Sequence, residues 1–270
     1  MSQATAALPG ATAIRMEAVA RRFPTSDGGW LSALEDFSLD IAPGEFCAIV
    51  GPTGCGKSTT LGLVAGLAQP QAGRVELFGQ RVGGIDRRVG YVFQQDALLP
   101  WRTVMGNVVA GPSFRGASRA EGEARARDWL ARVGLTAFEK SYPHQLSGGM
   151  RKRVALAQTF VNSPEVLLMD EPFSALDVQT RELMQEELLG LWSQNRAAVL
   201  FVTHDLDEAI LLADRVAVLT ARPARVKSIY RIDIPRPRPI AELRYEPAFI
   251  AIARQLSDDL REEVIKARRL

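Results

Sequence analysis

The chain has 270 residues, of which 47% are hydrophobic and 24% are charged, the balance of an ordinary soluble globular protein. This length suits one large α/β domain, alone or with a small appendage. The formal net charge of +2 arises from 33 basic and 31 acidic residues, which is too even a balance to indicate wholesale nucleic-acid binding.

The first 13 residues contain neither a basic region nor a sustained apolar stretch, so we expect a disordered lead-in and no signal peptide. No apolar run elsewhere approaches the roughly 18 residues that a membrane-spanning helix requires. If the protein acts at a membrane, a partner must therefore hold it there. Cys47 and Cys55 have no further Cys or His at metal-ligand spacing, and we expect small buried side chains in a reducing compartment.

Alternating or continuous apolar patterns predict several strands in the first third of the chain. They cover Ile14–Ala20, Leu34–Ile41, Phe46–Val50, Arg74–Phe78 and Val89–Phe93. A turn cluster at Thr25–Gly29 separates the first two strands, and the pattern of Ser58–Leu67 is helical. The third of these strands runs directly into glycines.

The sequence changes character in its middle part. Residues 101–162 are rich in Ala, Arg and Glu with apolar residues at helical spacing, which predicts a helical insertion. Uninterrupted apolar strands return at Val166–Asp170, Val199–Thr203 and Val216–Leu219, as expected for a parallel sheet covered on both faces. Prolines at 235, 237 and 239 then predict an extended stretch. An amphipathic helix follows, with its apolar stripe at Phe249, Ile252, Leu256, Leu260 and Val264.

The segment Gly51-Pro52-Thr53-Gly54-Cys55-Gly56-Lys57-Ser58 lies between a predicted strand and a predicted helix and matches the P-loop pattern. In such a loop, glycines let backbone N–H groups turn towards phosphates, and the helix N-terminus adds a favourable dipole. Lys57 supplies a positive charge to the β- and γ-phosphates of ATP, and the Ser58 hydroxyl is a hard oxygen ligand for Mg²⁺. A glycine-rich turn without a ligand is the alternative, but the Lys-Ser ending favours nucleotide binding, with Thr59 as the last contact residue.

A second candidate half-site stands at the end of the strand Val166–Asp170, where two carboxylates are adjacent. Asp170 can hold Mg²⁺ through water, and Glu171 could accept a proton from an attacking water. Taken alone, such a pair is better explained as an acidic strand end facing solvent. With the P-loop present, the catalytic interpretation is the better one.

Further motifs separate the classes of P-loop protein, namely GTPases, kinases, helicases and transporters. Leu146-Ser147-Gly148-Gly149-Met150 resembles the signature motif of the ABC family and stands upstream of Asp170, as in that family. Gln94 is similar to the Q-loop glutamine, Ser174-Ala175-Leu176-Asp177 is similar to the D-loop, and His204 is similar to the switch histidine. As isolated residues, Gln94 could be a surface side chain and His204 a polar cap; their order and spacing favour the motif roles.

The resemblance covers about residues 14–234 and leaves 235–270 as a Pro-rich segment and a helix. It implies a P-loop NTPase fold of the α/β class, with a RecA-like core whose sheet is mainly parallel. An antiparallel β-subdomain and a helical subdomain at about 97–162 would complete the fold.

The resemblance also implies a catalytic arrangement. Glu171, His204 and Gln94 would be catalytic, and Mg²⁺ would be held by Ser58, Gln94 and, through water, Asp170. Two cassettes would dimerise head to tail. Each ATP would lie between the P-loop of one copy and Ser147, Gly148, Gly149 and Met150 of the other.

Two positions depart from the common family pattern. Met150 replaces the usual Gln at the end of the signature, and we expect activity to survive because Ser147 and the two glycines make the phosphate contacts. Phe23 stands where the family places an adenine-stacking aromatic, commonly Tyr, so the ring face is kept and a hydroxyl is lost. Trp30 is a rival for this role, and Phe23 could also be ordinary core.

Residues 93–101, the signature, and the tail segments Arg222–Arg225 and Ile234–Arg238 are most similar to those of nitrate, sulfonate and taurine importer ATPases. The resemblance implies a peripheral ATPase at the cytoplasmic face of the inner membrane. Its partners would be integral permease subunits and, indirectly, a periplasmic or extracellular substrate-binding protein, without nucleic acid. Related importers of pyrimidine precursors and aromatic acids share these features, so the substrate stays open.

A soluble ABC ATPase acting on nucleic acid or ribosomes is the alternative function. Such proteins typically carry two fused cassettes or a long coiled-coil insertion, whereas this chain has one cassette and no sustained heptads. A P-loop kinase or GTPase has no reason to contain the segment Leu146–Met150. The apolar run Leu98–Trp101 permits two interpretations, a groove for a permease helix or local packing under the helical subdomain.

Overall fold

The computed structural model describes residues 12–268, which form two compact units. The first unit comprises residues 12–86 and 196–268, and the second comprises residues 87–195. Residues 1–11 of the predicted lead-in lie outside the described residues, whereas Ala13 is already buried and donates its N–H to Ile41 O at 2.8 Å. None of the helices in residues 12–268 combines the length and the apolar character needed to cross a bilayer.

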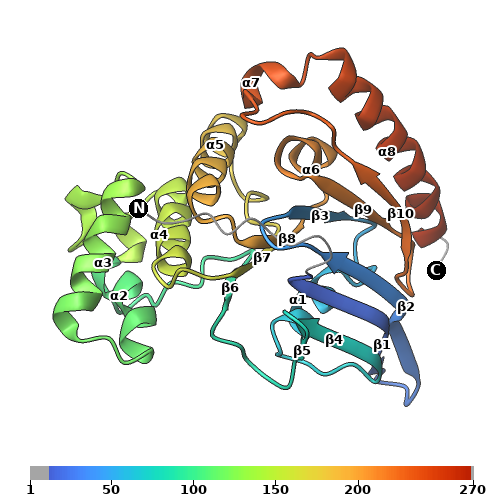
Figure 1. The fold of residues 1–270 in the computed structure, drawn as a ribbon, viewed down its shortest axis with the longest axis horizontal. Helices are drawn as coiled ribbons and strands as arrows, with labels where there is room; N and C mark the ends of the chain where they lie inside the picture. The colour runs from blue at the N-terminus through green and yellow to red at the C-terminus, as the bar shows by residue number, and fades with distance from the viewer. Residues whose placement is uncertain (1–11, 269–270) are drawn as a thin grey trace. The chain divides into compact units, whose positions relative to one another are not determined.

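An antiparallel sheet forms one layer of the first unit (Figure 1). Its strands follow the order β2-β1-β4-β5, with bounds Trp30–Ile41, Ile14–Pro24, Ala72–Leu77 and Gln80–Arg81. Inward and outward residues alternate along β1 until Ala18, whose φ of +46° accompanies a shift of register against β2. This sheet confirms the predicted antiparallel β-subdomain.

A second set of strands in the first unit is mainly parallel. Its order is β10-β9-β3-β8, with bounds Val226–Arg231, Arg215–Leu219, Phe46–Val50 and Ala198–Val202. β3 pairs in parallel with both β8 and β9, and β10 is antiparallel to β9. Every residue of β3 and β8 is buried, as their apolar runs predict for strands covered on both faces. The helix α1 (Lys57–Val64) follows β3, and α6 (Leu206–Leu212) follows β8.

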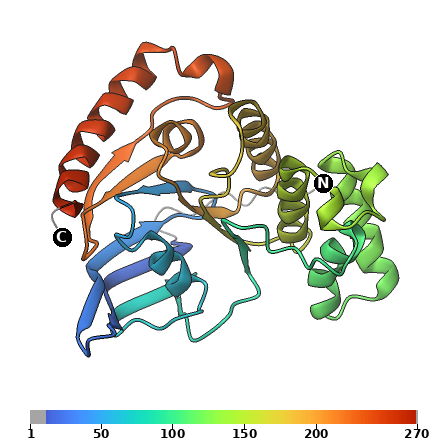
Figure 2. The ribbon, with the colours of Figure 1, turned by 180° about the vertical axis from the view of Figure 1, so that it is seen from behind.

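The C-terminal helix α8 (Pro247–Ala267) follows the short α7 (Ile240–Leu243) and packs on α6 and β9 of its own unit (Figure 1, Figure 2). Phe249 and Leu256 of the predicted stripe are buried. A polar cluster also fixes the helix to β10, because Lys227 Nζ lies 2.7 Å from Asp259 Oδ1. Glu263, which is 2% exposed, accepts a hydrogen bond from Ala221 N at 2.9 Å.

The second unit combines a strand pair with a group of helices. β6 (Val89–Val92) and β7 (Val166–Asp170) are parallel neighbours. Three helices lie within the predicted helical stretch 101–162, namely α2 (Val104–Phe114), α3 (Arg119–Arg132) and α4 (Gly148–Phe160), with short 3₁₀ turns at Thr136–Phe138 and Pro143–Gln145. The helix α5 (Val178–Asn195) follows β7 and lies outside that stretch.

Side-chain caps define where these helices begin. Thr103 accepts from Gly106 N at the start of α2, and Ser118 forms a capping box with Glu121 at the start of α3. The rings of Trp129 and Phe160, with centroids 5.4 Å apart, pack α3 on α4.

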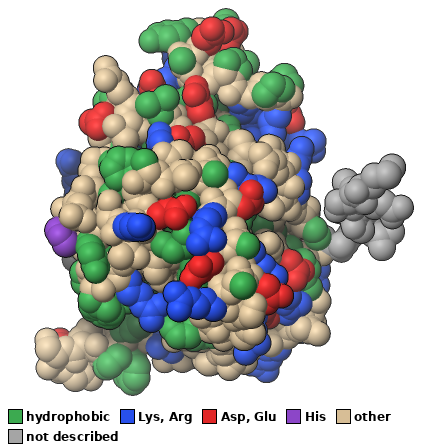
Figure 3. Space-filling model, turned by 90° about the vertical axis from the view of Figure 1, so that its left-hand side faces the viewer, with side chains coloured by type: hydrophobic (Ala, Val, Ile, Leu, Met, Phe, Trp, Pro, Cys, Tyr) green, Lys and Arg blue, Asp and Glu red, His purple; other side chains and the backbone are tan. Residues whose placement is uncertain are grey.

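On the face shown in Figure 3, basic and acidic side chains are interspersed without a large area of one sign.

Candidate functional site

The predicted phosphate loop leaves β3 and ends at the start of α1. Gly54 and Gly56 adopt φ values of +74° and +128°, which a residue with a side chain adopts only with strain. A Cβ atom at Gly56 would also lie 2.9 Å from Ala33 O. The loop conformation therefore depends on glycine at these positions, as the P-loop interpretation requires.

Lys57 is the first residue of α1 and is 7% exposed. Its Nζ donates to Gly51 O at 2.9 Å and to Pro52 O at 3.0 Å, so the ammonium bridges the beginning of the loop. The first turn of α1 contains no acidic residue, and this combination of a cation and a helix N-terminus suits nucleotide phosphates. Cys55 in the same loop is buried, and burial raises the pKa of its thiol, so it stays protonated at neutral pH.

His204 leaves the first unit's sheet at the same edge as the phosphate loop, because β3 and β8 are parallel neighbours. Its own loop is held on both sides. The buried Thr203 hydroxyl donates to Glu208 Oε2 at 2.6 Å. The Asp205 side chain caps α6 by accepting from the backbone N–H groups of Asp207 and Glu208. The exposed imidazole thus stands between two fixed residues, and Lys57 and His204 belong to one edge of one sheet.

The second unit repeats this arrangement at the ends of β6 and β7. Gln94 follows β6 and Asp170 ends β7, and Gln94 Nε2 lies 3.4 Å from Glu171 Oε2. The Tyr91 hydroxyl donates to Asp170 Oδ2 at 3.5 Å. Burial, and then the charge of Asp170, raise the pKa of Tyr91, so the phenol keeps its proton. The sequence did not reveal this role, because a tyrosine in a strand is equally consistent with core packing.

The backbone at Glu171 is unusual. Its φ is +42°, a left-handed conformation that costs a non-glycine residue about 1–2 kcal/mol. Ser174 of the predicted D-loop holds this turn, since its N–H and its hydroxyl both donate to Glu171 O, at 3.2 and 3.0 Å. Asp177 accepts from the third N–H of α5 at 3.0 Å, and this bond lowers the pKa of its carboxyl. The other two D-loop positions are the exposed Ala175 and the buried Leu176.

The predicted signature forms the beginning of α4. Ser147 is the exposed N-cap and accepts from Met150 N at 3.3 Å, while Gly148 and Gly149 are the first helical residues. A Cβ atom at Gly149 would lie 2.9 Å from Thr180 Cγ2 of α5, so glycine permits the close packing of the two helices. An exposed, glycine-lined helix N-terminus of this kind suits a phosphate group.

Two aromatic side chains compete for the predicted adenine-stacking role. Phe23 is 36% exposed, and the Arg21 guanidinium lies 5.0 Å from the centroid of its ring. Trp30 is 66% exposed and lies opposite Pro24, next to Phe23 on the paired strand. Both rings therefore lie at the same end of the β1–β2 hairpin, and the prediction keeps both candidates.

The predicted Mg²⁺ ligands fit that ion chemically. The Ser58 hydroxyl, the Gln94 amide oxygen and the Asp170 carboxylate are hard oxygen donors, which Mg²⁺ prefers. Within residues 12–268, no group of three or more His, Cys, Asp or Glu side chains could hold a metal ion by itself. Phosphate oxygens would therefore have to complete the ligand set, as is usual for Mg²⁺ at nucleotide sites.

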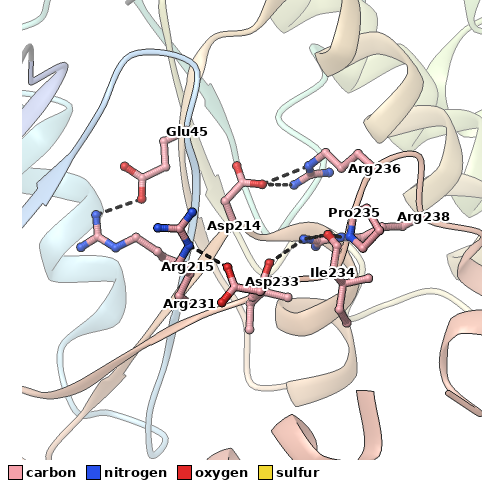
Figure 4. A pocket seen from close by; sticks show the side chains of 10 residues that line it. Glu45, Asp214, Arg215, Arg231, Asp233, Ile234, Pro235, Arg236 and Arg238 are labelled. Carbon is pink, nitrogen blue, oxygen red and sulfur yellow. Dashed lines mark hydrogen bonds and ion pairs between the residues drawn. The ribbon is translucent and has the colours of Figure 1, made fainter. Parts of the chain in front are cut away.

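The tail segment Ile234–Arg238 lies against the end of α6 and lines a pocket of the first unit (Figure 4). Arg236 donates twice to Asp214 Oδ1, at 3.0 and 2.8 Å. Arg238 is 7% exposed and instead caps the C-terminus of α6. It donates to the carbonyl oxygens of Ile210, Leu211 and Ala213 at 3.0, 3.1 and 2.7 Å. Burial lowers the pKa of Arg238 to about 10, so the guanidinium is charged at neutral pH.

We expect Arg238→Met to lower the free energy of unfolding by about 2–3 kcal/mol, because several buried carbonyl groups lose a charged donor. Urea unfolding followed by circular dichroism measures this loss. Arg231→Met is the matched control, since its side chain is 82% exposed and pairs only locally with Asp233; we expect a change within about 0.5 kcal/mol. Equal effects of the two substitutions would show that the cap does not stabilise α6.

Comparison with known proteins identifies the relatives of this chain. Residues 34–174 match the family model described as ABC transporter. An uncharacterised ABC transporter ATP-binding protein of Methanocaldococcus jannaschii is 46% identical over 241 residues, which cover 89% of each chain. A taurine import ATP-binding protein of Roseobacter denitrificans is 40% identical, covering 88% of this chain and 90% of the relative. An aliphatic sulfonates import ATP-binding protein of Xanthomonas axonopodis pv. citri is 46% identical, covering 78% and 84%.

A solved structure shows the same fold. It is a dimeric post-hydrolysis state of an ATP-binding cassette bound to ADP and Pi, and it is 32% identical to this chain with a TM-score of 0.73. The match covers 82% of this chain and 100% of the solved one. The predicted fold class, a P-loop NTPase with parallel and antiparallel sheets, is confirmed.

Proposed function

The chain belongs to the family of ABC transporter ATPases, and from this we propose that it is the ATP-hydrolysing subunit of an importer for a small anionic nutrient. The observation that carries the catalytic part is the contact between Gln94 and Glu171, 3.4 Å apart at the ends of two parallel strands. Comparing ATP turnover by the purified chain with turnover by its Glu171→Gln variant tests this part.

In the proposed reaction, Lys57 and the N–H groups of its loop bind the β- and γ-phosphates of ATP. Glu171 accepts a proton from the attacking water, and Gln94 orients that water from its position beside the carboxylate. His204 stabilises the negative charge that develops on the γ-phosphate. When bound, Mg²⁺ neutralises charge on the phosphate oxygens; Ser58, Gln94 and Asp170 are the residues that would hold it.

The proposed working unit is a head-to-tail homodimer. The exposed N-terminus of α4 presents Ser147 and two glycines, and we propose that this surface completes the ATP site of a second copy. The solved relative is described as dimeric and bound to ADP and Pi, which supports a dimer here as well.

The importer branch and the substrate class rest on the relatives. Two of them are named for taurine import and for aliphatic sulfonates import, and taurine is itself a sulfonate. We propose a sulfonate, taurine or nitrate class of substrate. The chain would work as a peripheral subunit at the cytoplasmic face of the inner membrane, with integral permease subunits as direct partners. A substrate-binding protein on the periplasmic or extracellular side of the membrane would deliver the nutrient to the permease.

An apolar hollow in the second unit is the proposed docking place for a permease helix. It is lined by parts of β6, α2, α4 and the loop after Gln94, and includes Phe93, Leu99 and Phe114. Phe93 and Phe114 are 44% and 78% exposed, and Trp101 of the neighbouring loop is 71% exposed. Grouped exposed apolar side chains are typical of interaction sites. Phe93 stacks on Tyr91, with ring centroids 4.2 Å apart, whereas Trp101 and Phe114 remain largely exposed. The two exposed rings favour the groove interpretation of Leu98–Trp101.

A buried side chain fixes the shape of this loop. Asn107 is fully buried and accepts from Leu99 N at 2.7 Å. Its amide nitrogen donates to three carbonyl oxygens, those of Leu99, Arg102 and Thr103. Because every polar group of Asn107 is used locally, the main chain at Leu99, which lines the hollow, is held in place without a partner.

We expect Leu99→Glu to weaken assembly with the permease by about tenfold or more, since a carboxylate would have to be buried in an apolar contact. Affinity purification of the tagged chain from detergent-solubilised membranes, with quantification of co-purifying polytopic proteins, measures the effect. Ile85→Glu is the control, because Ile85 is 80% exposed in the first unit. If Leu99→Glu and the parent retain equal amounts of permease, the hollow is not the docking place.

The alternative function, a soluble ATPase acting on nucleic acid or ribosomes, gains no support from the taurine and sulfonate relatives, whose names describe import. Cell fractionation separates the two functions. We expect the chain to sediment with membranes, whereas co-sedimentation with ribosomes after membrane removal would favour the alternative.

A further inference from the structure

Lys152 joins the loop that carries Gln94 to the helix that begins at the signature. It lies in the second turn of α4 and is 5% exposed. Its Nζ donates to the backbone oxygen of Gln94 at 2.7 Å and lies 3.0 Å from Asp96 Oδ1. Arg151 Nε lies 3.2 Å from the other oxygen of Asp96. One carboxylate of the loop is therefore shared by two neighbouring cations of the helix.

The position of Lys152 cannot be explained by the helix alone. A cation close to a helix N-terminus opposes the helix dipole, and the first turn of α4 has no acidic residue to offset it. Burying an ammonium group is also unfavourable unless it is paired and hydrogen-bonded. Asp96 and the Gln94 carbonyl meet both needs, so the lysine is retained at this place by its contacts with the loop.

We infer that Lys152 is a positioning residue for ATP hydrolysis. By holding the main chain at Gln94, it keeps the Gln94 side chain within 3.4 Å of Glu171. The same contact joins this loop to α4, the helix whose N-cap is Ser147. The inference rests on the proposed function, because it concerns the reaction assigned to Glu171.

Lys152→Met tests the inference, since methionine keeps an apolar stem of similar length and removes the donors. For the full-length chain, we expect kcat for ATP hydrolysis to fall about tenfold or more, because misplacing a catalytic group by about an ångström costs up to ~10²-fold. The KM for ATP should change by less than about threefold, since Lys57 and the N–H groups of its loop, to which the phosphate contacts are assigned, do not change. Arg153→Met is the matched control, because Arg153 pairs with Glu187 at 2.6 Å and not with the loop.

A double substitution separates positioning from general stabilisation. In a Gln94→Ala background, Lys152→Met should lower kcat by less than about twofold further, because no side-chain amide is left to position. If the two losses multiply, Lys152 acts independently of Gln94 and the inference is wrong. If Lys152→Met does not fold, Asp96→Asn replaces it, with the same dependence on Gln94 expected. A parent chain without ATPase activity would contradict the proposed function, whereas an active parent and an equally active Lys152→Met would overturn only this inference.

Discussion

We expect Glu171→Gln to slow ATP hydrolysis by about 10²–10⁴-fold while leaving ATP binding intact, because the variant loses the general base and little else. The amide is nearly isosteric with the carboxylate. The turn at Glu171 is held through its backbone oxygen by Ser174, so the substitution leaves the local conformation in place. Lys57 and Ser58 do not change, and ATP should remain bound.

Single-turnover hydrolysis measures this loss without the complication of product release. Glu165→Gln is the matched control, since Glu165 is exposed and directly precedes the first residue of β7, the strand that ends at Asp170. Gel filtration with ATP and Mg²⁺ adds a second readout, in which the slow variant should accumulate as a dimer. If Glu171→Gln turns ATP over at close to the parent rate, Glu171 is not the base, and His204 with Gln94 would have to position the water.

We expect Lys57→Ala to weaken ATP binding by about 30-fold or more, because removing one member of a buried charged contact costs roughly 2–5 kcal/mol. The physical reason lies in the loop. Lys57 is 7% exposed, and its ammonium group lies inside the loop that would bind the phosphates, where it donates to Gly51 O and Pro52 O. Without the ammonium, the phosphate charge is left to neutral N–H groups and the helix dipole.

Titration with a fluorescent ATP analogue measures the affinity of the Lys57 variant. Lys140→Ala is the control, since Lys140 is an exposed lysine of the second unit. Thermal unfolding must be recorded in parallel, because Lys57 also bridges Gly51 and Pro52. A folded Lys57→Ala protein with parent affinity would contradict the phosphate-site assignment.

The parts of the fold that the sequence predicted share one property, a signal carried by neighbouring residues. The buried strands Phe46–Val50 and Val166–Asp170 have the predicted bounds, because continuous apolar runs end at glycines or carboxylates. The strand β10 was not predicted. Its residues Val226–Arg231 are half-buried or exposed, and such an edge strand has no apolar run to reveal it.

The contacts that complete the site depend on residues far apart in the chain. Lys152 and Gln94 are separated by 58 positions, and no local pattern distinguishes a buried lysine from a solvated one. Arg238 reaches Ile210 across 28 positions, so the proline–arginine segment was visible in the sequence while its capping role was not. The choice between Phe23 and Trp30 depends on the bound base itself, and neither the pattern nor the exposure of the two rings decides it.

Nutrient uptake by whole cells tests the central claim most directly. The gene for this chain is deleted in its source organism and restored as the parent or as Glu171→Gln, and entry of isotope-labelled taurine, an alkanesulfonate and nitrate is measured. The account predicts that deletion abolishes uptake of at least one of these anions, that the parent chain restores it, and that Glu171→Gln does not. Full uptake of all three anions in the deletion strain, or restoration by Glu171→Gln, would contradict an ATPase that powers their import.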